Sequence, residues 1–101
     1  MILRTWHGRT KREDADAYEK FTVERAGSDY PSVAGFRKFY FTRRDEGDVS
    51  HFFLVTVWDS LEAVKRFAGE EPEKAKYYPE DDRFLLEKEE HSFNHVIFHE
   101  S

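Results

Sequence analysis

Two tryptophans and an arginine are the side chains best suited to bind a ligand. Trp58 closes the apolar run Phe52–Trp58 before a short helical pattern, so its indole either locks that helix onto a sheet or walls a pocket and donates its N–H to a ligand oxygen. Arg4 and Trp6 share one face of a strand, where a guanidinium beside an indole suits an anionic or aromatic ligand. A salt bridge from Arg4 to one of the many carboxylates is an equally good interpretation.

Three histidines recur every four residues near the end of the sequence, at positions 91, 95 and 99. On a strand this spacing puts neighbouring imidazoles roughly 13 Å apart, whereas a zinc ion holds its ligands at about 2 Å. We therefore expect no metal site. His95 stays open as a single proton donor or acceptor, beside a structural or surface role.

Several classes of function are excluded by what the sequence lacks. There is no cysteine, which removes thiolate nucleophiles and cysteine-based metal centres, and there is no glycine-rich phosphate loop or nucleophile elbow. The net charge of −5 argues against a nucleic-acid partner, which needs a clustered basic face. No apolar run approaches the length of a membrane span and no signal-peptide pattern opens the sequence, so we expect a cytoplasmic protein with no membrane partner.

The patterning of apolar residues predicts the elements that position these side chains within one domain, residues 1–101. A strand at Ile2–Gly8 precedes a helix that starts with capping-box spacing at Thr10–Glu13 and stops at Gly27. The same spacing recurs at Asp59–Glu62 and starts a second helix. The remaining predictions are a hairpin of strands Phe36–Arg44 and Val49–Trp58, short helical turns at Pro72–Tyr78 and Arg83–Glu87, and a last strand at Ser92–His99.

The order β-α-β-β-α-β is the split βαβ arrangement, so we predict an α+β, ferredoxin-like fold with helices on one face of an antiparallel sheet. Both hairpin strands are apolar on both faces, with Phe36 and Tyr40 opposite Phe39 and Phe41 in one, and Phe53 and Val55 opposite Phe52 and Leu54 in the other. A sheet with one wet face alternates apolar and polar residues, so the second face needs a cover as well. We expect an identical subunit there, giving a homodimer.

Whole segments of the sequence add a further indication: Met1–Arg9, Phe52–Val64, Phe67–Glu70, Glu73–Leu86 and Phe93–Val96. Together they resemble the antibiotic-biosynthesis monooxygenase (ABM) domain family over nearly the whole chain. The resemblance implies a dimeric α/β barrel of ferredoxin-like subunits, each with a pocket between sheet and helices. It also implies oxidation of polycyclic phenolic substrates by molecular oxygen with no metal, flavin or haem cofactor.

The match to this family differs from position to position. Trp58 stands where the family has a tryptophan, whereas Leu54 stands where it has an asparagine. A haem-degrading branch of the same superfamily has an asparagine, a tryptophan and a histidine at about the positions of Trp6, Phe67 and Tyr77, and none of these matches. The resemblance therefore favours the cofactor-free branch over haem degradation.

We interpret the protein as a cofactor-independent monooxygenase acting on a small aromatic or quinone-type metabolite. In this hypothesis Trp58 orients the substrate, Arg4 favours its anion and His95 accepts a proton, while the pocket walls are Trp6, Leu54, Phe67 and Tyr77. The alternatives are a non-catalytic domain that binds a small molecule, and a structural dimer in which Trp58 and Phe67 are packed solid. Polar groups that converge in the pocket would favour the enzyme.

Overall fold

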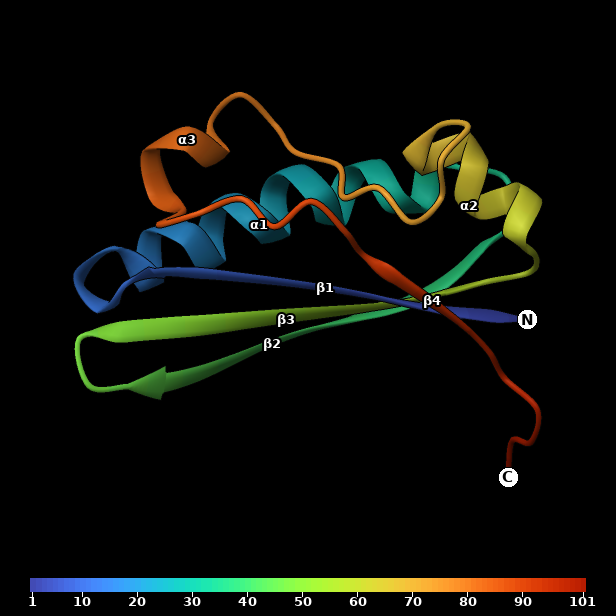
Figure 1. Ribbon diagram of the computed structural model, residues 1–101, viewed down its shortest axis with the longest axis horizontal. Helices are drawn as coiled ribbons and strands as arrows, with labels where there is room; N and C mark the ends of the chain where they lie inside the picture. The colour runs from blue at the N-terminus through green and yellow to red at the C-terminus, as the bar shows by residue number, and fades with distance from the viewer.

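The computed structural model describes residues 1–101 and contains one four-stranded antiparallel sheet. Its strands are β1 (Ile2–Lys11), β2 (Phe36–Glu46), β3 (Val49–Trp58) and β4 (Phe93–Val96), in the order β2-β3-β1-β4. The helices α1 (Ala15–Asp29), α2 (Leu61–Ala68) and α3 (Asp81–Phe84) all lie on one side of this sheet (Figure 1). The predicted α+β, ferredoxin-like fold is confirmed.

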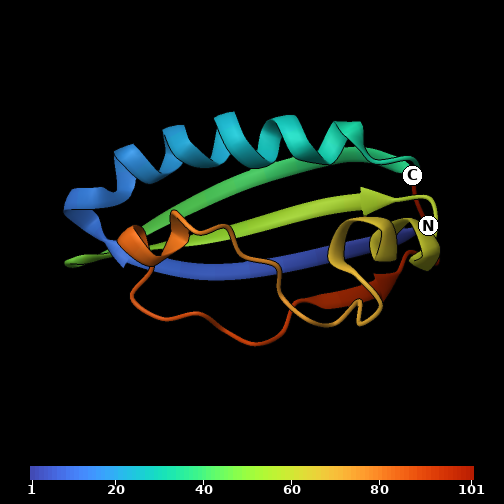
Figure 2. The same ribbon diagram turned by 90° about the horizontal axis from the view of Figure 1, so that it is seen from above.

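The helical layer is divided into two parts. Figure 2 shows α1 running along the β2 edge, while α2, α3 and the segment between them lie over β1 and β4. The helix-facing side chains of the two central strands are buried beneath these parts, among them Arg4, Trp6, Phe52, Leu54 and Trp58. None of the helices combines the length and apolar character needed to cross a lipid bilayer.

β2 departs from the predicted alternation at its beginning. A bulge between Phe36 and Lys38 inserts one residue into the pairing with β3. An extra residue reverses the parity of the side chains before it. Phe36 therefore packs on the helix side with Phe39 and Phe41, and its predicted place beside the exposed Tyr40 is wrong.

α1 begins later and ends later than its sequence signals predict. Thr10 is still part of β1, which stays paired with β3 as far as Lys11. The Thr10 hydroxyl donates to the Lys11 carbonyl. The predicted capping box is therefore absent, and a 3-10 turn, Arg12–Asp14, leads into the helix. At the other end the helix continues through Gly27, which has no positive φ, to a 3-10 turn at Tyr30–Ser32. Sheet pairing and continued helical packing outweigh these local signals.

The boundaries in the second half also shift. α2 is capped by the Ser60 hydroxyl, which accepts from the Ala63 N–H at 3.2 Å, so the predicted cap at Asp59 is one residue early. The stretch Pro72–Tyr78 forms no helical turn, and the short helix predicted at Arg83–Glu87 lies instead at Asp81–Phe84. β4 covers four residues of the predicted last strand.

Two groups of buried side chains fill the space between helices and sheet. The first, here called the Trp58 cluster, lies beside α2 and consists of Ala26, Tyr30, Trp58, Ala63, Val64 and Phe67. The second, the Trp6 cluster, lies under the beginning of α1 and consists of Trp6, Ala15, Tyr18, Phe52 and Leu54. The two clusters divide the core along the length of the sheet.

Candidate functional site

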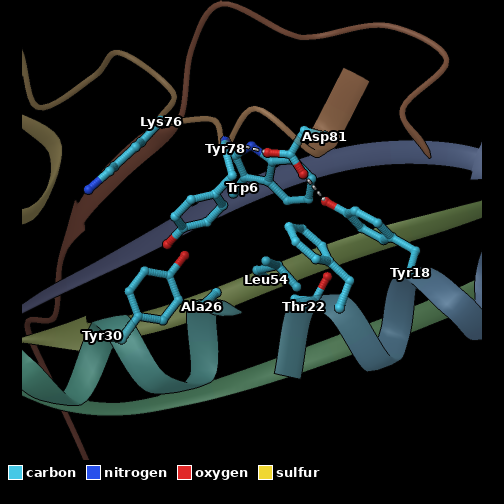
Figure 3. A pocket seen from close by; sticks show the side chains of 10 residues that line it. Trp6, Tyr18, Thr22, Ala26, Tyr30, Leu54, Lys76, Tyr78 and Asp81 are labelled. Carbon is cyan, nitrogen blue, oxygen red and sulfur yellow. Dashed lines mark hydrogen bonds between the residues drawn. The ribbon is translucent and has the colours of Figure 1, made fainter. Parts of the chain in front are cut away.

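A small cavity lies between α1, the sheet and the segment before α3 (Figure 3). Its volume is about 30 Å³, and we call it the inner cavity. Since a water molecule needs roughly 10–15 Å³ of such space, the inner cavity has room for about two waters. Trp6 and Leu54 reach it from the sheet, so two of the seven predicted site residues line it.

Trp6 projects from the helix-facing side of β1, and its ring lies over Gly8, two residues further along the strand. A side chain at Gly8 would overlap the Trp6 ring, so the glycine is what allows the indole to lie flat on the sheet. The ring also meets Tyr77 edge-on, with centroids 6.1 Å apart. Trp6 is 9% exposed, and its Nε1 lies beside the Tyr77 hydroxyl but makes no hydrogen bond of ordinary geometry. A buried N–H without a partner is costly, and a ligand oxygen would relieve the cost.

A row of residues on α1 and the turn after it supplies hydroxyl groups to the same cavity. Tyr18, Thr22, Ala26 and Tyr30 recur every four residues and all line it. The Thr22 hydroxyl lies near the Tyr18 hydroxyl, and the Tyr78 hydroxyl, across from α1, lies near Asp29, but neither makes a hydrogen bond of ordinary geometry. In Figure 3 the Tyr30 and Tyr78 hydroxyls approach one another. Burial raises the pKa of Tyr30 to about 12, so this phenol is a neutral hydroxyl at neutral pH.

Asp81 is the acidic group of the cavity, and only 3% of it is exposed. One carboxylate oxygen accepts from the Tyr18 hydroxyl at 3.2 Å, and the other accepts from the Tyr78 backbone N–H at 2.7 Å. Burial raises the pKa of Asp81 above its usual range. A carboxyl group of raised pKa hydrogen-bonded to a phenol is suited to exchange a proton with a ligand hydroxyl.

Sequence reasoning missed the hydroxyls and the carboxyl of this cavity. The sequence presents Tyr18 only as part of an apolar helix stripe, and Asp81 only as part of an acidic surface. Hydroxyl-bearing side chains stand at three of the four positions spaced by four residues from Tyr18 to Tyr30, with Ala26 as the exception, and this spacing was a usable signal for the helix face. Nothing in the spacing around Asp81 distinguishes it from its exposed neighbour Asp82.

Arg4 does not line the inner cavity and instead holds the segment that follows α2. Its guanidinium donates to the carbonyl oxygens of Pro72 and Lys74, the latter at 3.0 Å, and approaches Asn94 Oδ1 at 3.5 Å. The alternative prediction of a carboxylate salt bridge is wrong, because only neutral oxygens receive these bonds. Burial lowers the pKa of Arg4. The side chain fastens residues 72–74 to the sheet.

Trp58 and Phe67 lie together in the Trp58 cluster, outside the inner cavity. Trp58 is completely buried, and its Nε1 donates to the Thr56 hydroxyl at 2.8 Å. The ring of Phe67 lies 4.6 Å from that of Tyr30 and 5.7 Å from that of Trp58. These side chains are packed solid, and the Trp58 N–H has no capacity left for a ligand.

Tyr77 and His95 lie on other surfaces. The Tyr77 hydroxyl donates to the Glu89 carbonyl at 2.6 Å, and Tyr77 lines a separate surface hollow together with residues 70–75 and 88–91. His95 is paired with Leu3, whose side chain points away from the helices. Directly paired residues of antiparallel strands share a face, so His95 lies on the open side of the sheet.

A larger space, here called the outer chamber, lies beside the inner cavity between α1 and the strands β2 and β3. Its volume is about 250 Å³. Apolar side chains of Val23, Phe41 and Phe52 form part of its wall, and Thr22 and Leu54 line both spaces. The site is therefore a pair of adjoining spaces with a shared wall.

A chain of polar contacts crosses the open side of the sheet. His7 Nδ1 lies 2.5 Å from Glu89 Oε2, His7 Nε2 lies 3.1 Å from His51 Nδ1, and His51 Nε2 lies 3.2 Å from Glu46 Oε1. The two imidazole rings are stacked with centroids 5.3 Å apart. No three His, Asp or Glu side chains come together in a geometry that could hold a metal ion.

The fold is shared with solved structures of two other proteins. A crystal structure of an MhuD variant, with two manganese protoporphyrin IX groups bound per active site, matches with a TM-score of 0.65 and 15% identity, covering 100% of this chain and 98% of that one. A protein from Bacillus cereus, provisionally assigned as an antibiotic biosynthesis monooxygenase, matches with a TM-score of 0.63 and 14% identity, covering 100% and 94%. No protein-family model matches the sequence, and no curated protein matches it significantly. The similarity is one of fold.

Proposed function

We propose that the protein is an oxygen-dependent monooxygenase that acts, without a metal or flavin cofactor, on a small aromatic or quinone-type metabolite bound between α1 and the sheet. One observation carries the proposal: buried polar side chains gather around one aromatic-lined cavity, among them the Asp81 carboxyl and the Thr22 and Tyr78 hydroxyls, which make no hydrogen bond of ordinary geometry. Convergent polar groups in an apolar pocket are typical of ligand sites. The fold shared with an assigned monooxygenase agrees with this function.

The chemistry balances without an external reductant. A phenol and O₂ give a quinone and water: one oxygen atom enters the ring, the other leaves in water with two hydrogens of the substrate, and the substrate supplies all four electrons. The protein must bind the ring, exclude water and move the hydroxyl proton. Tyr18 and Asp81 take the proton in this proposal, since the Tyr18 hydroxyl lines the cavity and is backed by a buried carboxyl.

A haem does not fit this site, although the similar MhuD variant binds manganese protoporphyrin IX. The residues that line the inner cavity and outer chamber include no histidine. A macrocycle of four pyrrole rings is also several times larger than the single benzene ring that a cavity of about 150 Å³ accommodates. The proposed reaction therefore has no step that uses a haem.

Oxygen consumption in the presence of 1-naphthol tests the proposed activity. Loss of a general acid or base lowers turnover by about 10²–10⁴-fold, and we expect a loss in this range for Asp81→Asn. Asp82→Asn is the matched control, because Asp82 is exposed and paired with Lys88. Equal turnover by the two folded variants would remove Asp81 from the mechanism. No oxygen uptake with naphthols, hydroquinones or anthrols would reject the enzyme.

A non-catalytic binding domain is the second candidate. It is favoured by the fact that the predicted charged and donor groups are already used: Arg4 holds backbone carbonyls and Trp58 donates to Thr56. In this case 1-naphthol binds to the protein with no oxygen uptake, and Asp81→Asn changes affinity alone. The same two measurements therefore decide between the candidates.

We also propose that the protein is a cytoplasmic homodimer whose subunits pack through the open side of the sheet. This side carries Leu3, Tyr40, Phe53, Val55 and Phe93, and Phe53 is 44% exposed although it sits at the centre of a strand. The polar chain from Glu89 to Glu46 borders the same apolar area. Such a face is typical of an interface with a second sheet.

Sedimentation velocity tests the dimer. An obligate interface buries about 2,000 Å² or more in total, and we expect a dimer at micromolar concentration. Phe53→Asp should give monomer, aggregate or unfolded chain, because a buried unpaired carboxylate is strongly unfavourable. A stable wild-type monomer would overturn this assembly and leave the ligand site unaffected.

A further inference from the structure

The inner cavity and the outer chamber differ in size by enough to decide where a ring can bind. An apolar cavity of about 150 Å³ holds a benzene molecule. The outer chamber, at about 250 Å³, therefore takes a flat molecule of one or two rings, whereas the inner cavity, at about 30 Å³, takes no ring at all. The inner cavity does have room for one small polar group, and Thr22 and Tyr78, whose hydroxyls make no hydrogen bond of ordinary geometry, line it.

We propose that the ligand is a neutral one- or two-ring aromatic alcohol or ketone, whose ring lies in the outer chamber and whose single oxygen reaches past Thr22 and Leu54 into the inner cavity. This assignment deepens the proposed function and rests on its placement of the ligand between α1 and the sheet. Thr22 and Leu54 are then the specificity-determining residues, since they line both spaces.

Thr22 is the residue that links the two spaces chemically. It is 5% exposed, and its hydroxyl lies near the Tyr18 hydroxyl but makes no hydrogen bond of ordinary geometry to any group of the protein. A buried threonine hydroxyl commonly bonds to the carbonyl one turn earlier, and this one does not. Its unused donor and acceptor suit a hydroxyl or carbonyl oxygen that enters from the outer chamber.

The charge beside the outer chamber explains why the ligand is neutral. The Arg43 guanidinium in its wall lies 2.8 Å from Asp16, from Glu19 and from Asp45. Arg12 also lies 3.7 Å from Asp45, so two cations among three carboxylates leave a net negative charge there, which repels an anionic ligand. The cavity side offers neutral hydroxyls as donors to an uncharged oxygen, and its two ionisable residues of opposite sign, Lys76 and Asp81, give it no excess of positive charge.

Binding of 1-naphthol and 1-naphthoate, measured by isothermal titration calorimetry at neutral pH, tests the charge and the size. The two probes share a ring system, and we expect 1-naphthol to bind at least about tenfold more tightly because of the negative surroundings. Val23→Trp fills the outer chamber from an exposed position on α1 and should weaken 1-naphthol binding by about tenfold or more. Val96→Trp is the matched control, since Val96 is exposed on β4 and lines neither space.

Thr22→Val tests the oxygen contact, because valine keeps the shape of the side chain and removes the hydroxyl. We expect about a fivefold to tenfold loss of 1-naphthol affinity, the effect of one neutral hydrogen bond. Naphthalene, which has the same rings and no oxygen, should bind wild type and Thr22→Val equally. Equal loss for both probes would mean that Thr22 contributes only shape and would overturn the oxygen assignment.

The outcomes separate this inference from the proposed activity. If 1-naphthol binds more tightly than 1-naphthoate and the variants weaken binding as expected, but no oxygen is consumed, the two-part site of outer chamber and inner cavity is supported and the monooxygenase is rejected. Oxygen uptake that is unchanged in both Val23→Trp and Thr22→Val supports the enzyme and rejects the two-part site. Wild-type protein that binds no 1-naphthol, or that prefers 1-naphthoate, overturns the inference directly.

Discussion

Trp6 and Trp58 both lie buried on the helix-facing side of the sheet, but only Trp58 has its hydrogen-bonding capacity filled. The Trp58 N–H donates to Thr56, and rings of Tyr30, Phe36 and Phe67 pack around its indole. The Trp6 N–H has no partner, and its ring borders the inner cavity. Burial alone therefore does not separate a packing anchor from a pocket wall.

The difference between the two clusters teaches where ligand binding is compatible with stability. The Trp58 cluster joins α2 to the sheet through closely packed apolar contacts. The Trp6 cluster leaves space and leaves polar atoms unbonded, both of which cost folding free energy. Ala26 and Tyr30 of the Trp58 cluster also line the inner cavity, whereas Trp58 itself does not, so substitutions of the two tryptophans should have different effects on ligand binding.

Trp58→Ala should have the largest effect. Truncation of a fully buried tryptophan typically costs about 3–5 kcal/mol, which is a large share of the stability of a domain of this size. The unfolding free energy from urea denaturation measures it. The fraction of the variant that stays folded should bind 1-naphthol as wild type does. A loss of unfolding free energy below about 1 kcal/mol would show that the Trp58 cluster is loosely packed.

Gly8→Ala should have the next largest effect, because a methyl group at this position overlaps the Trp6 ring and also meets Leu85. Overpacking of this kind costs about 1–3 kcal/mol, and displacement of Trp6 should also weaken 1-naphthol binding. Gly27→Ala is the matched control. Its nearest neighbours are 3.8 Å or more away and it lies in α1, where alanine is favoured by up to about 1 kcal/mol. Equal effects of the two substitutions would contradict the close approach at Gly8.

Trp6→Phe should change stability less, by about 1 kcal/mol or less, because lost contact area is offset by removal of an N–H without a partner. Trp58→Phe should cost about 1–3 kcal/mol, since it removes contacts and a satisfied hydrogen bond together. The effects on binding should have the opposite order to the effects on stability. The affinity for 1-naphthol should fall in Trp6→Phe and stay unchanged in Trp58→Phe. Calorimetric titration of both folded variants makes the comparison, and the opposite order would exchange the roles of the two tryptophans.

The pH dependence at Asp81 should be the smallest effect. Burial raises the pKa of this carboxyl, so the folded chain keeps a proton that the unfolded chain has already lost. Stability therefore falls as the pH rises from the unfolded value of about 3.9 to the folded pKa, and is constant above it. Asp81→Asn removes this fall, so the stability of the variant relative to wild type should improve across that window. Parallel curves for Asp81→Asn and the exposed control Asp82→Asn would contradict the raised pKa.

The sheet was predictable because the side chains of β3 alternate between its two faces. Phe52, Leu54 and Trp58 are all buried on one side as the alternation requires. Helix ends were less predictable, because signals such as Thr10 and Gly27 act over a few residues and yield to sheet pairing and helix packing over longer distances.

The site was predictable in part. Trp6 and Leu54 were placed by strand parity, which a sequence displays directly. Tyr78 reaches the cavity from a segment without regular structure, and Asp81 reaches it from the start of α3, a helix too short for a periodic pattern to assign the direction of its side chains. Trp58 looked equivalent to Trp6 because a sequence does not reveal which N–H finds an internal partner.

The hydrogen bonds that Arg4 donates to the segment after α2 limit which sequence changes this chain tolerates in evolution. These bonds end on backbone carbonyl oxygens at positions 72 and 74, and every residue type has such an oxygen. Substitutions there leave the acceptors in place, whereas an inserted or deleted residue would move them out of reach. Relatives of this chain should therefore vary in the identity of these residues and keep the length of the segment between α2 and the Tyr78 side of the cavity constant.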